Sequence, residues 1–287
     1  FIVQIHGFPL KEQKIRLNKC FMHFKIIWFI ILVRHLLAIK LMKHYSSLIL
    51  VNNAEVKFFY ESMGIPSNKL KIISSAINVK EHKRHILSRT EARKYLGLVK
   101  SSDVIIGYIG GLKHEKNVEV LIKAFSDFIK NSFDVKVKLI IIGDGPARAV
   151  LEEAVNERNI SNYVFFLGYV PDAYRFLSAI DIFVLPSLSE GSPIVILEAM
   201  VCGRAIIASN IPAIKEMVKN GKEALLFDPH NSAQLENLIL TLYNNPKLRE
   251  KLGENARRKA KQYDVNVIFP KILQIYKRVL RSSANSN

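Results

Sequence analysis

From Asp103 onward, short apolar segments of strand length alternate with longer segments of helix length. This alternation favours a parallel, doubly wound α/β sheet, because each helix returns the chain to the same end of the sheet. Strands are expected at residues 104–109, 135–142, 163–167, 182–185, 205–208 and 224–227, with helices that include 118–129 and 147–158. Ligands of such sheets bind beyond the carboxyl ends of the strands. The glycine-bearing loops fall at these ends: Gly110-Gly111, Gly143-Asp144-Gly145, Gly168 and Glu190-Gly191.

The segment 181–203, DIFVLPSLSEGSPIVILEAMVCG, predicts a strand, a turn-rich loop and a helix. Ser192 is expected to be the helix N-cap and Pro193 the first helical residue, since each residue type is favoured at that position. Gly203 fits the position just past the helix end, where a left-handed conformation is common. The helix has almost no polar face, which is typical of a helix buried on all sides.

Two carboxylates belong to this segment, Glu190 in the loop and Glu198 in the middle of the apolar helix. A buried carboxylate must be paired, neutralised or held for a ligand. The N–H groups at a helix start favour an anion. The segment therefore offers an anion site and two acceptors for hydroxyl groups, which is the combination that a sugar attached to a nucleoside diphosphate presents. The spacing alone equally allows a Glu198 that is satisfied by neighbouring backbone and a Glu190 that is merely solvated.

Both acidic residues lie in EGSPIVILE, which resembles the ExxxxxxxE motif of retaining glycosyltransferases with the GT-B fold. The wider stretch, from PSLSEGSPIVILEAMVCGRAIIASNIPAIKEMV to GKEALLFDP, resembles glycosyltransferase family 4. The resemblance implies a GT-B type α/β fold with two Rossmann-like doubly wound domains. It also implies that the first domain is incomplete and lacks its first part.

Three regions are expected on this basis. Residues 1–98 would be a partial N-terminal, acceptor-side domain, residues 99–265 the C-terminal nucleotide-sugar-binding domain, and residues 266–287 a crossover helix with a polar tail. The basic composition of residues 80–100 favours an interdomain linker there. At the turn before this segment the family usually has Pro-Asn-Gly and then Ile-Asp, whereas this chain has Ser74-Ser75-Ala76-Ile77-Asn78.

A first phosphate-binding candidate combines Gly110 and Gly111 with Lys116. Glycines let the backbone approach a pyrophosphate, and a lysine adds a point charge. The string GYIGGLKHEKNVEVLIKAF resembles the family's G-R-L followed by E-K-G or E-K-N, so Lys116 matches the donor-phosphate lysine and Gly111 stands at the family's arginine position. The alternative for Lys116 is a solvated residue at a helix start. The resemblance also places Gly143 near the nucleoside and Val170 near the base.

The resemblance implies a role for each remaining candidate. Glu198 would bind the ribose of the donor, and Glu190 would accept hydrogen bonds from the hydroxyl groups of the donor sugar. The backbone at the helix start would hold the diphosphate together with Lys116, through Gly191, Ser192, Pro193 and Ile194. Glu190 and His6 are the catalytic candidates, with His6 beside the anomeric carbon. A loop histidine at the end of the strand expected in residues 1–9 is the alternative for His6.

The formal net charge of +17 concerns partners rather than fold. The sequence has no helix-turn-helix, zinc-finger or RNA-recognition signature, so no nucleic acid partner is expected. A basic surface that faces a glycan acceptor, a lipid-linked acceptor or an anionic membrane is one interpretation, and a lysine-rich genome without functional meaning is the other. The basic and apolar segment 15–45 leaves open an interfacial membrane helix or an ordinary core helix. Its apolar run at 26–33 is too short to span a membrane.

The sequence contains no Asp-x-Asp, so we expect a metal-independent mechanism without a metal site or a cofactor, in which the nucleotide-diphosphate sugar is the donor substrate. The two cysteines, Cys20 and Cys202, favour a reducing, cytoplasmic setting, and peripheral attachment to the inner face of the membrane is compatible with it. The predicted function is transfer of the donor sugar to a glycan or lipid-linked acceptor with retention of anomeric configuration. The alternative is a catalytically incomplete nucleotide-sugar-binding or partner-binding remnant.

Overall fold

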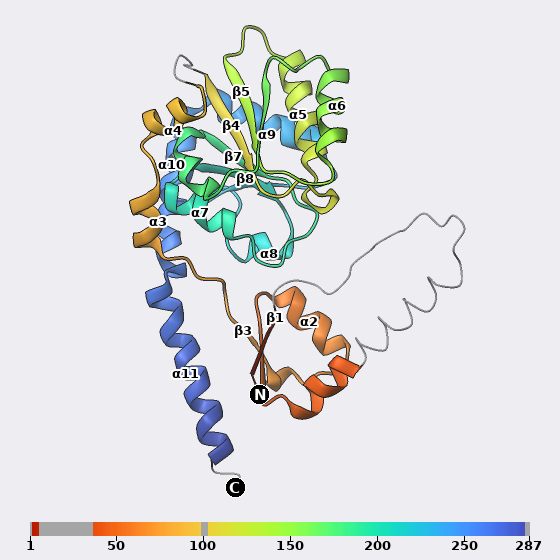
Figure 1. The fold of residues 1–287 in the computed structure, drawn as a ribbon, viewed down its shortest axis with the longest axis vertical. Coiled ribbons are helices and arrows are strands. Elements are labelled where there is room, and N and C mark those ends of the chain that lie inside the picture. The colour runs from red at the N-terminus through yellow and green to blue at the C-terminus, as the bar shows by residue number, and fades with distance from the viewer. Residues whose placement is uncertain (1, 6–36, 99–102, 285–287) are drawn as a thin grey trace, which may run out of the picture. The chain divides into compact units, whose positions relative to one another are not determined.

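The computed structural model describes residues 2–5, 37–98 and 103–284 of the 287-residue chain (Figure 1). The chain folds into two compact units. Unit 1 consists of Phe1–Ser75 with Pro270–Asn287, and unit 2 consists of Ala76–Phe269. His6 and the apolar run at 26–33 lie outside the described residues.

Unit 1 contains a small parallel sheet in the order β1-β2-β3, formed by β1 (Ile2–Ile5), β2 (Leu48–Val51) and β3 (Leu70–Ile72). Helix α2 (Ala54–Ser62) and the short helix η1 (Ser67–Lys69) connect β2 to β3. The α2 helix begins after Asn53, whose side chain accepts a hydrogen bond from the Val56 N–H at 2.8 Å and so satisfies one donor of the first turn. The buried core of this unit is formed by Ile49, Val51, Val56, Tyr60, Ile65 and Leu70.

Unit 2 contains a six-stranded sheet in the order β6-β5-β4-β7-β8-β9, and all its strand pairs are parallel. The strands are β4 (Val104–Ile109), β5 (Val137–Ile142), β6 (Val164–Gly168), β7 (Ile182–Leu185), β8 (Ala205–Ser209) and β9 (Leu225–Phe227). The predicted parallel, doubly wound sheet is therefore confirmed. The strand order reverses between β4 and β7, and in such sheets the crevice at this reversal is the usual ligand site.

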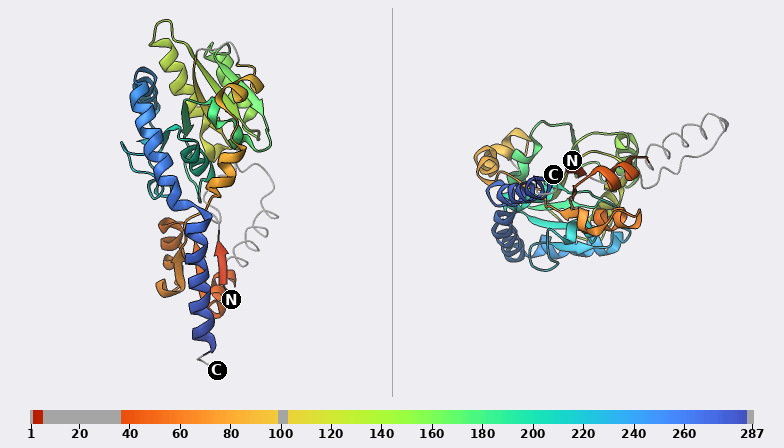
Figure 2. Two further views of the ribbon diagram at one scale, coloured as in Figure 1. Left: turned by 90° about the vertical axis from the view of Figure 1, so that its left-hand side faces the viewer. Right: turned by 90° about the horizontal axis from the view of Figure 1, so that it is seen from below.

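Helices cover both faces of this sheet, with α5, α6 and α9 on one side and α7 and α10 on the other. The sequence of strands and helices can be followed by colour, from yellow to blue, in Figures 1 and 2. The helices of the unit are α3 (Val79–His85), α4 (Arg89–Tyr95), η2 (His114–Lys116), α5 (Val118–Lys130), α6 (Arg148–Glu157), η3 (Ala173–Ala179), α7 (Ile194–Cys202), α8 (Pro212–Lys215), α9 (Ser232–Asn244), α10 (Pro246–Ala260) and η4 (Lys261–Tyr263), after which α11 (Val265–Ala284) begins.

The apolar runs of the sequence become the interior of unit 2. Strands β7 and β8 are buried along their whole length, and Leu121, Phe125 and Phe128 of α5 are buried as well. Each such side chain contributes about 1.5–3 kcal/mol when it leaves water. No helix in the described part of the chain combines the length and the apolar character that crossing a membrane requires.

Some element boundaries differ from the sequence-based expectation. Helix α7 begins at Ile194, so its N-cap is Pro193 rather than Ser192, while Gly203 ends the helix in the expected left-handed conformation (φ 65°). The strand expected at residues 135–142 is shorter and covers Val137–Ile142. Within the segment 80–100, where the linker was expected, α3 and α4 are helical and belong to unit 2.

Candidate functional site

The candidate site lies at the reversal of strand order, where the loops after β4 and β7 follow two neighbouring strands. Lys116 ends η2 in the loop after β4, and Glu190 lies in the loop after β7. The Lys116 Nζ is 2.8 and 2.9 Å from the two carboxylate oxygens of Glu190. The fold thus brings together two candidate residues that are far apart in the sequence.

The Glu190 carboxylate is almost fully enclosed, since its side chain is only 8% exposed, whereas that of Lys116 is 26% exposed. The Ser187 hydroxyl donates a further hydrogen bond to Glu190 Oε1 at 2.7 Å. Tyr108 lies close by, and its pKa is raised, mainly by burial and to a lesser degree by the negative charge of Glu190 and Glu115. A buried negative charge needs such partners, and Lys116 and Ser187 supply them.

Asn117 fixes the two loops relative to each other. It has a left-handed backbone (φ 53°), which asparagine tolerates better than most residues. Its side-chain amide donates to the carbonyl oxygens of Pro186 at 3.1 Å and Pro229 at 2.8 Å. The Leu188 N–H also donates to the Glu115 carbonyl at 2.9 Å. These bonds explain how Lys116 and Glu190 are held in register.

The glycine loops after β4 and β5 contact each other through their backbones. The Gly110 N–H donates to Ile142 O at 3.0 Å, and the Gly143 N–H donates to Gly168 O at 2.8 Å. A Cβ atom at Gly143 would overlap the Gly110 carbonyl oxygen, and the φ of 142° there is rarely adopted by other residues. The Gly111 carbonyl accepts a hydrogen bond from the Tyr108 hydroxyl at 2.9 Å. Gly110, Gly111 and Gly143 therefore lie in one tightly joined set of loops at the carboxyl ends of the strands.

The start of α7 follows Glu190 directly. Gly191, Ser192 and Pro193 form the short connection to the helix, and Pro193 is buried whereas Ile194 is 50% exposed. Pro193, the N-cap residue of α7, makes no side-chain cap hydrogen bond. The first N–H groups of this nine-residue helix carry the partial positive charge of the helix dipole.

Glu198 lies one turn further along α7, on the same side as Ile194, and its side chain is 17% exposed. Its Oε1 is 3.8 Å from the Nε2 atom of His82, which belongs to α3. Burial, with a smaller contribution from Asp172, raises the pKa of Glu198 to about 7. The sequence left open whether the Glu198 carboxyl group is paired, neutralised or held for a ligand. The structure places it beside His82, and its raised pKa favours the protonated, neutral form.

Val170 lies two residues beyond β6 and is half-buried against the core of unit 2. Its neighbour Tyr169 is 77% exposed. The same loop ends at Asp172, which has a left-handed backbone (φ 50°) and precedes Tyr174, whose ring centre is 4.6 Å from that of His82. The loop after β6 therefore reaches the surroundings of Glu198.

Sequence reasoning did not identify Ser187, Asn117 and His82 as parts of this site. Ser187 precedes Glu190 by three residues, a spacing from which a hydrogen bond can be anticipated. The contacts of Asn117 and His82 join segments that are 69 and 116 residues away, and no local pattern predicts them. Gly107 lies inside β4, where an added Cβ would overlap the side chain of Ile180.

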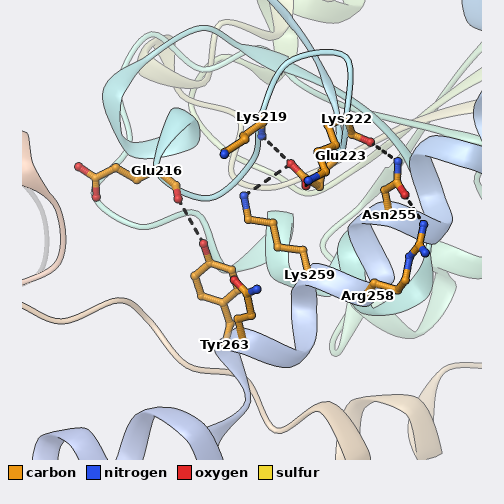
Figure 3. A pocket seen from close by; sticks show the side chains of 9 residues that line it. Glu216, Lys219, Lys222, Glu223, Asn255, Arg258, Lys259 and Tyr263 are labelled. Atoms are coloured by element: carbon orange, nitrogen blue, oxygen red, sulfur yellow. Dashed lines mark hydrogen bonds and ion pairs between the residues drawn. The ribbon is translucent and has the colours of Figure 1, made fainter.

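Unit 2 also has a cavity of about 650 Å³ that contains none of the candidate residues (Figure 3). It lies between the segment after α8 and the end of α10, and its charged groups are bound to one another. The buried Glu223 accepts from the Lys219 N–H at 2.8 Å and lies 3.5 Å from Lys259 Nζ, while Asn255 donates to the Lys222 carbonyl at 2.8 Å. We interpret this cluster as a structural connection between α10 and the preceding loop.

The described residues contain no group of three or more His, Cys, Asp or Glu side chains that could hold a metal ion. Cys202 is a buried free thiol, and burial raises its pKa. The candidate site thus consists of one lysine, two carboxyl groups, a helix start and glycine loops.

Known proteins resemble this chain in both sequence and fold. The family model of Glycosyl transferases group 1 matches residues 89–259, more than half of the chain. The N,N'-diacetylbacillosaminyl-diphospho-undecaprenol alpha-1,3-N-acetylgalactosaminyltransferase of Campylobacter jejuni is 30% identical over 242 residues, which cover 82% of this chain and 61% of that protein. The crystal structure of Anabaena HepE in complex with UDP-glucose has a TM-score of 0.75 at 24% identity and covers 84% of this chain and 66% of that one. The C-terminal domain of a group 1 glycosyl transferase from Francisella tularensis has a TM-score of 0.57 at 22% identity and covers 66% of this chain and 99% of that one.

The chain belongs to the family of group 1 glycosyl transferases, as the family match establishes and the predicted resemblance implied. The structural likeness confirms the predicted GT-B type of α/β fold over the matched part. The chain spans 61% of the length of the Campylobacter jejuni relative. Residues 89–259 include Lys116, Glu190 and Glu198 but not His82 or His6.

Proposed function

We propose that this protein transfers a sugar from a nucleoside-diphosphate sugar to a lipid-linked or glycan acceptor, with retention of configuration at the anomeric carbon and without a metal ion. The observation that carries the proposal is the meeting of Lys116 and Glu190 at the reversal of strand order, inside the segment that matches the family. The name of the Campylobacter jejuni relative, with its diphospho-undecaprenol acceptor, supports a lipid-linked acceptor.

In this proposal unit 2 binds the donor. Glu198 accepts hydrogen bonds from the ribose, and the loops that contain Gly143 and Val170 surround the nucleoside. Lys116 and the start of α7, with Gly110, Gly111 and Gly191 to Ile194, hold the diphosphate. Glu190 accepts hydrogen bonds from the hydroxyl groups of the sugar, and His6, outside the described residues, faces the anomeric carbon from the acceptor-side domain.

The chemical task is to stabilise the negative charge that develops on the diphosphate as the bond to the sugar breaks. A fixed ammonium group and a helix start are suited to this task, because they already point at the charge before it forms. Lys116 is bound to Glu190 in the structure, so binding of a phosphate at Nζ exchanges one anionic partner for another. The proposal therefore assigns the pair a double role, with Glu190 released toward the sugar as Lys116 turns to the phosphate.

The first test is a thermal-shift screen with UDP-, GDP- and dTDP-sugars. A ligand at a hundred times its Kd stabilises the folded state by about 2.7 kcal/mol, which gives a clear rise in Tm. The selected donor is then assayed with an undecaprenyl-diphosphate-linked sugar as acceptor, for the wild type, Glu190→Ala and Glu198→Ala. We expect Glu190→Ala to lose about a hundredfold or more in kcat, the scale seen when groups that stabilise developing charge are removed. We expect Glu198→Ala to raise the KM for the donor about tenfold, because the ribose contact is the same before and during the reaction.

The matched control is Glu119→Ala, since Glu119 is an exposed glutamate in the first turn of α5. It should keep wild-type transfer, and circular dichroism should show all three variants folded. An undiminished kcat of Glu190→Ala or an unchanged donor KM of Glu198→Ala would overturn the assigned mechanism. Donor binding without transfer by the wild type would instead favour the nucleotide-sugar-binding remnant.

A further inference from the structure

His82 occupies a defined position between α3 and α7. Asn78 caps α3 by accepting a hydrogen bond from the Glu81 N–H at 3.0 Å, which sets the first turn and the direction of the His82 side chain. The imidazole Nδ1 lies 3.0 Å from the Asn78 carbonyl oxygen, and Nε2 lies 3.8 Å from Glu198 Oε1. The ring also contacts Tyr174, and the side chain is 22% exposed. Three contacts thus fix one imidazole ring against one carboxyl group.

The contact with Asn78 determines the position of one proton on the imidazole ring of His82. A carbonyl oxygen only accepts hydrogen bonds, so the bond to Asn78 requires a proton on Nδ1. The Nε2 atom then either holds a lone pair that faces a protonated Glu198, or a proton that faces the Glu198 carboxylate. In both arrangements Nε2 and Oε1 attract each other across 3.8 Å, which is longer than a hydrogen bond, and the pair is neutral as a whole. Loss of one proton from the pair leaves a lone pair facing a carboxylate, which removes the attraction between the two side chains.

We propose that His82 is a positioning residue for ribose recognition: its Nε2 attracts Glu198 Oε1 across 3.8 Å and leaves the second carboxyl oxygen to accept the ribose hydroxyl groups. This inference rests on the proposed donor site. It adds a residue outside the segment that matches the family, and it makes nucleotide recognition depend on the protonation of the pair.

The other charged and titratable groups around His82 and Glu198 influence the pH at which the proton is lost. On α3 these are Glu81 and His85, which lie 3.5 Å apart. From the loop after β6 and from η3 come Asp172, Tyr174 and Arg175, which share electrostatic interactions with one another or with Glu198. From α10, Arg257 binds the Cys202 carbonyl at 3.2 Å, at the far end of α7. Because burial and Asp172 raise the pKa of Glu198 to about 7, Glu198 is expected to lose its proton as the pH rises through about 7.

The experiment measures the Kd of UDP and of 2′,3′-dideoxy-UDP by calorimetry between pH 6.5 and 9. The ratio of the two constants reports the ribose hydroxyl groups alone, because the base and the diphosphate are the same in both probes. For the wild type we expect a ratio of about ten at pH 6.5 that falls to about two at pH 9, since tenfold corresponds to one good hydrogen bond to a charged group. The three variants to compare are His82→Ala, His82→Gln and His85→Gln, with folding checked by Tm.

His82→Ala should have the low ratio at every pH. His82→Gln should keep the high ratio at every pH, because the amide N–H replaces Nε2–H and does not titrate in this range. His85→Gln, on the same helix, should behave as the wild type. Equal and unchanging ratios in wild type and His82→Ala, with UDP binding still weakened about tenfold in Glu198→Ala, would overturn the role of His82 and leave the donor site standing. Failure of the wild type to bind UDP would overturn both.

Discussion

The ion pair of Lys116 and Glu190 is asymmetric, and this asymmetry predicts how its two side chains respond to substitution. Glu190 is 8% exposed and cannot turn to water, whereas Lys116 is 26% exposed and can. Lys116→Met removes the cation from a buried carboxylate that keeps its hydrogen bond from the Ser187 hydroxyl. It should lower the free energy of unfolding by about 1–3 kcal/mol. Glu190→Gln should cost less than about 1 kcal/mol, because the remaining ammonium group is solvated.

Urea unfolding of the two single variants and of the double variant measures the coupling between them. The double variant should be more stable than the sum of the single effects by about 1 kcal/mol, since removing both charges leaves neither unpaired. Lys113→Met, an exposed lysine in the same loop, is the matched control and should change stability by less than about 0.5 kcal/mol. Strictly additive effects would show that the pair contributes nothing beyond its separate side chains.

The raised pKa of Glu198 leads to a separate prediction about how the free energy of unfolding depends on pH. Its pKa in the folded state is raised to about 7 from 4.5, so the folded state holds a proton that the unfolded state loses first. Its contribution to stability is complete below pH 4.5 and is lost as the pH rises toward 7. Relative to Glu198→Gln, the wild type should therefore lose up to about 3 kcal/mol of unfolding free energy between pH 4.5 and pH 8. Urea titrations of both proteins at several pH values test this, and parallel stability curves would contradict it.

At the scale of single elements, α7 shows what a local pattern can and cannot predict. Its apolar run and Gly203 correctly predicted a buried helix and its end. The start was misplaced by one residue, because the helix begins at Ile194 and Pro193 takes the N-cap position instead of the first helical position. The partner of Glu198 was unpredictable, since His82 reaches it only through the packing of α3 on α7.

Gly203 provides a test of how α7 is joined to α10. Its left-handed φ of 65° costs any other residue about 1–2 kcal/mol. An added Cβ would also overlap the guanidinium of Arg257, which hydrogen-bonds the Cys202 carbonyl. Gly221 has a similar φ of 72° but open space around it, so Gly221→Ala is the control for the backbone term alone. Gly203→Ala should lower the unfolding free energy by about 1 kcal/mol more than Gly221→Ala does, because it also displaces Arg257. Equal losses in urea titrations would show that Arg257 moves without cost.

At the scale of the whole molecule, the sequence correctly predicted the class of sheet in unit 2. Alternating strands and helices are sufficient for a parallel, doubly wound sheet, and the glycine loops mark the carboxyl ends of its strands. Strand order is not a local property, so the meeting of the loops after β4 and β7 was not predictable from spacing alone. The backbone pairing of Ile77 with Asp264, which joins the beginning of unit 2 to its end, was not predictable from spacing either.

The pairing of Ile77 with Asp264 and the separate hydrophobic clusters predict that unit 2 is an independent folding unit. Among the described residues, one hydrophobic cluster is formed between Ile77 and Tyr263 and the other between Ile49 and Leu70, and the two clusters share no side chain. The Ile77 N–H donates to the Tyr263 carbonyl at 2.9 Å and the Val265 N–H donates to the Ile77 carbonyl at 3.0 Å. Residues 76–269 expressed alone should therefore unfold in one cooperative transition, as monitored by far-ultraviolet circular dichroism.

The same fragment separates binding from transfer. Every described candidate for the donor site lies within residues 76–269, so the fragment should bind UDP within about threefold of the Kd of the full chain. It lacks His6 and the rest of unit 1, and should therefore transfer no sugar. A fragment with Ile77→Asp is the internal control, since it places a charge at a position that is 2% exposed and should lose the cooperative transition. A fragment that stays unfolded, or that folds and does not bind UDP while the full chain does, would show that the donor site depends on unit 1.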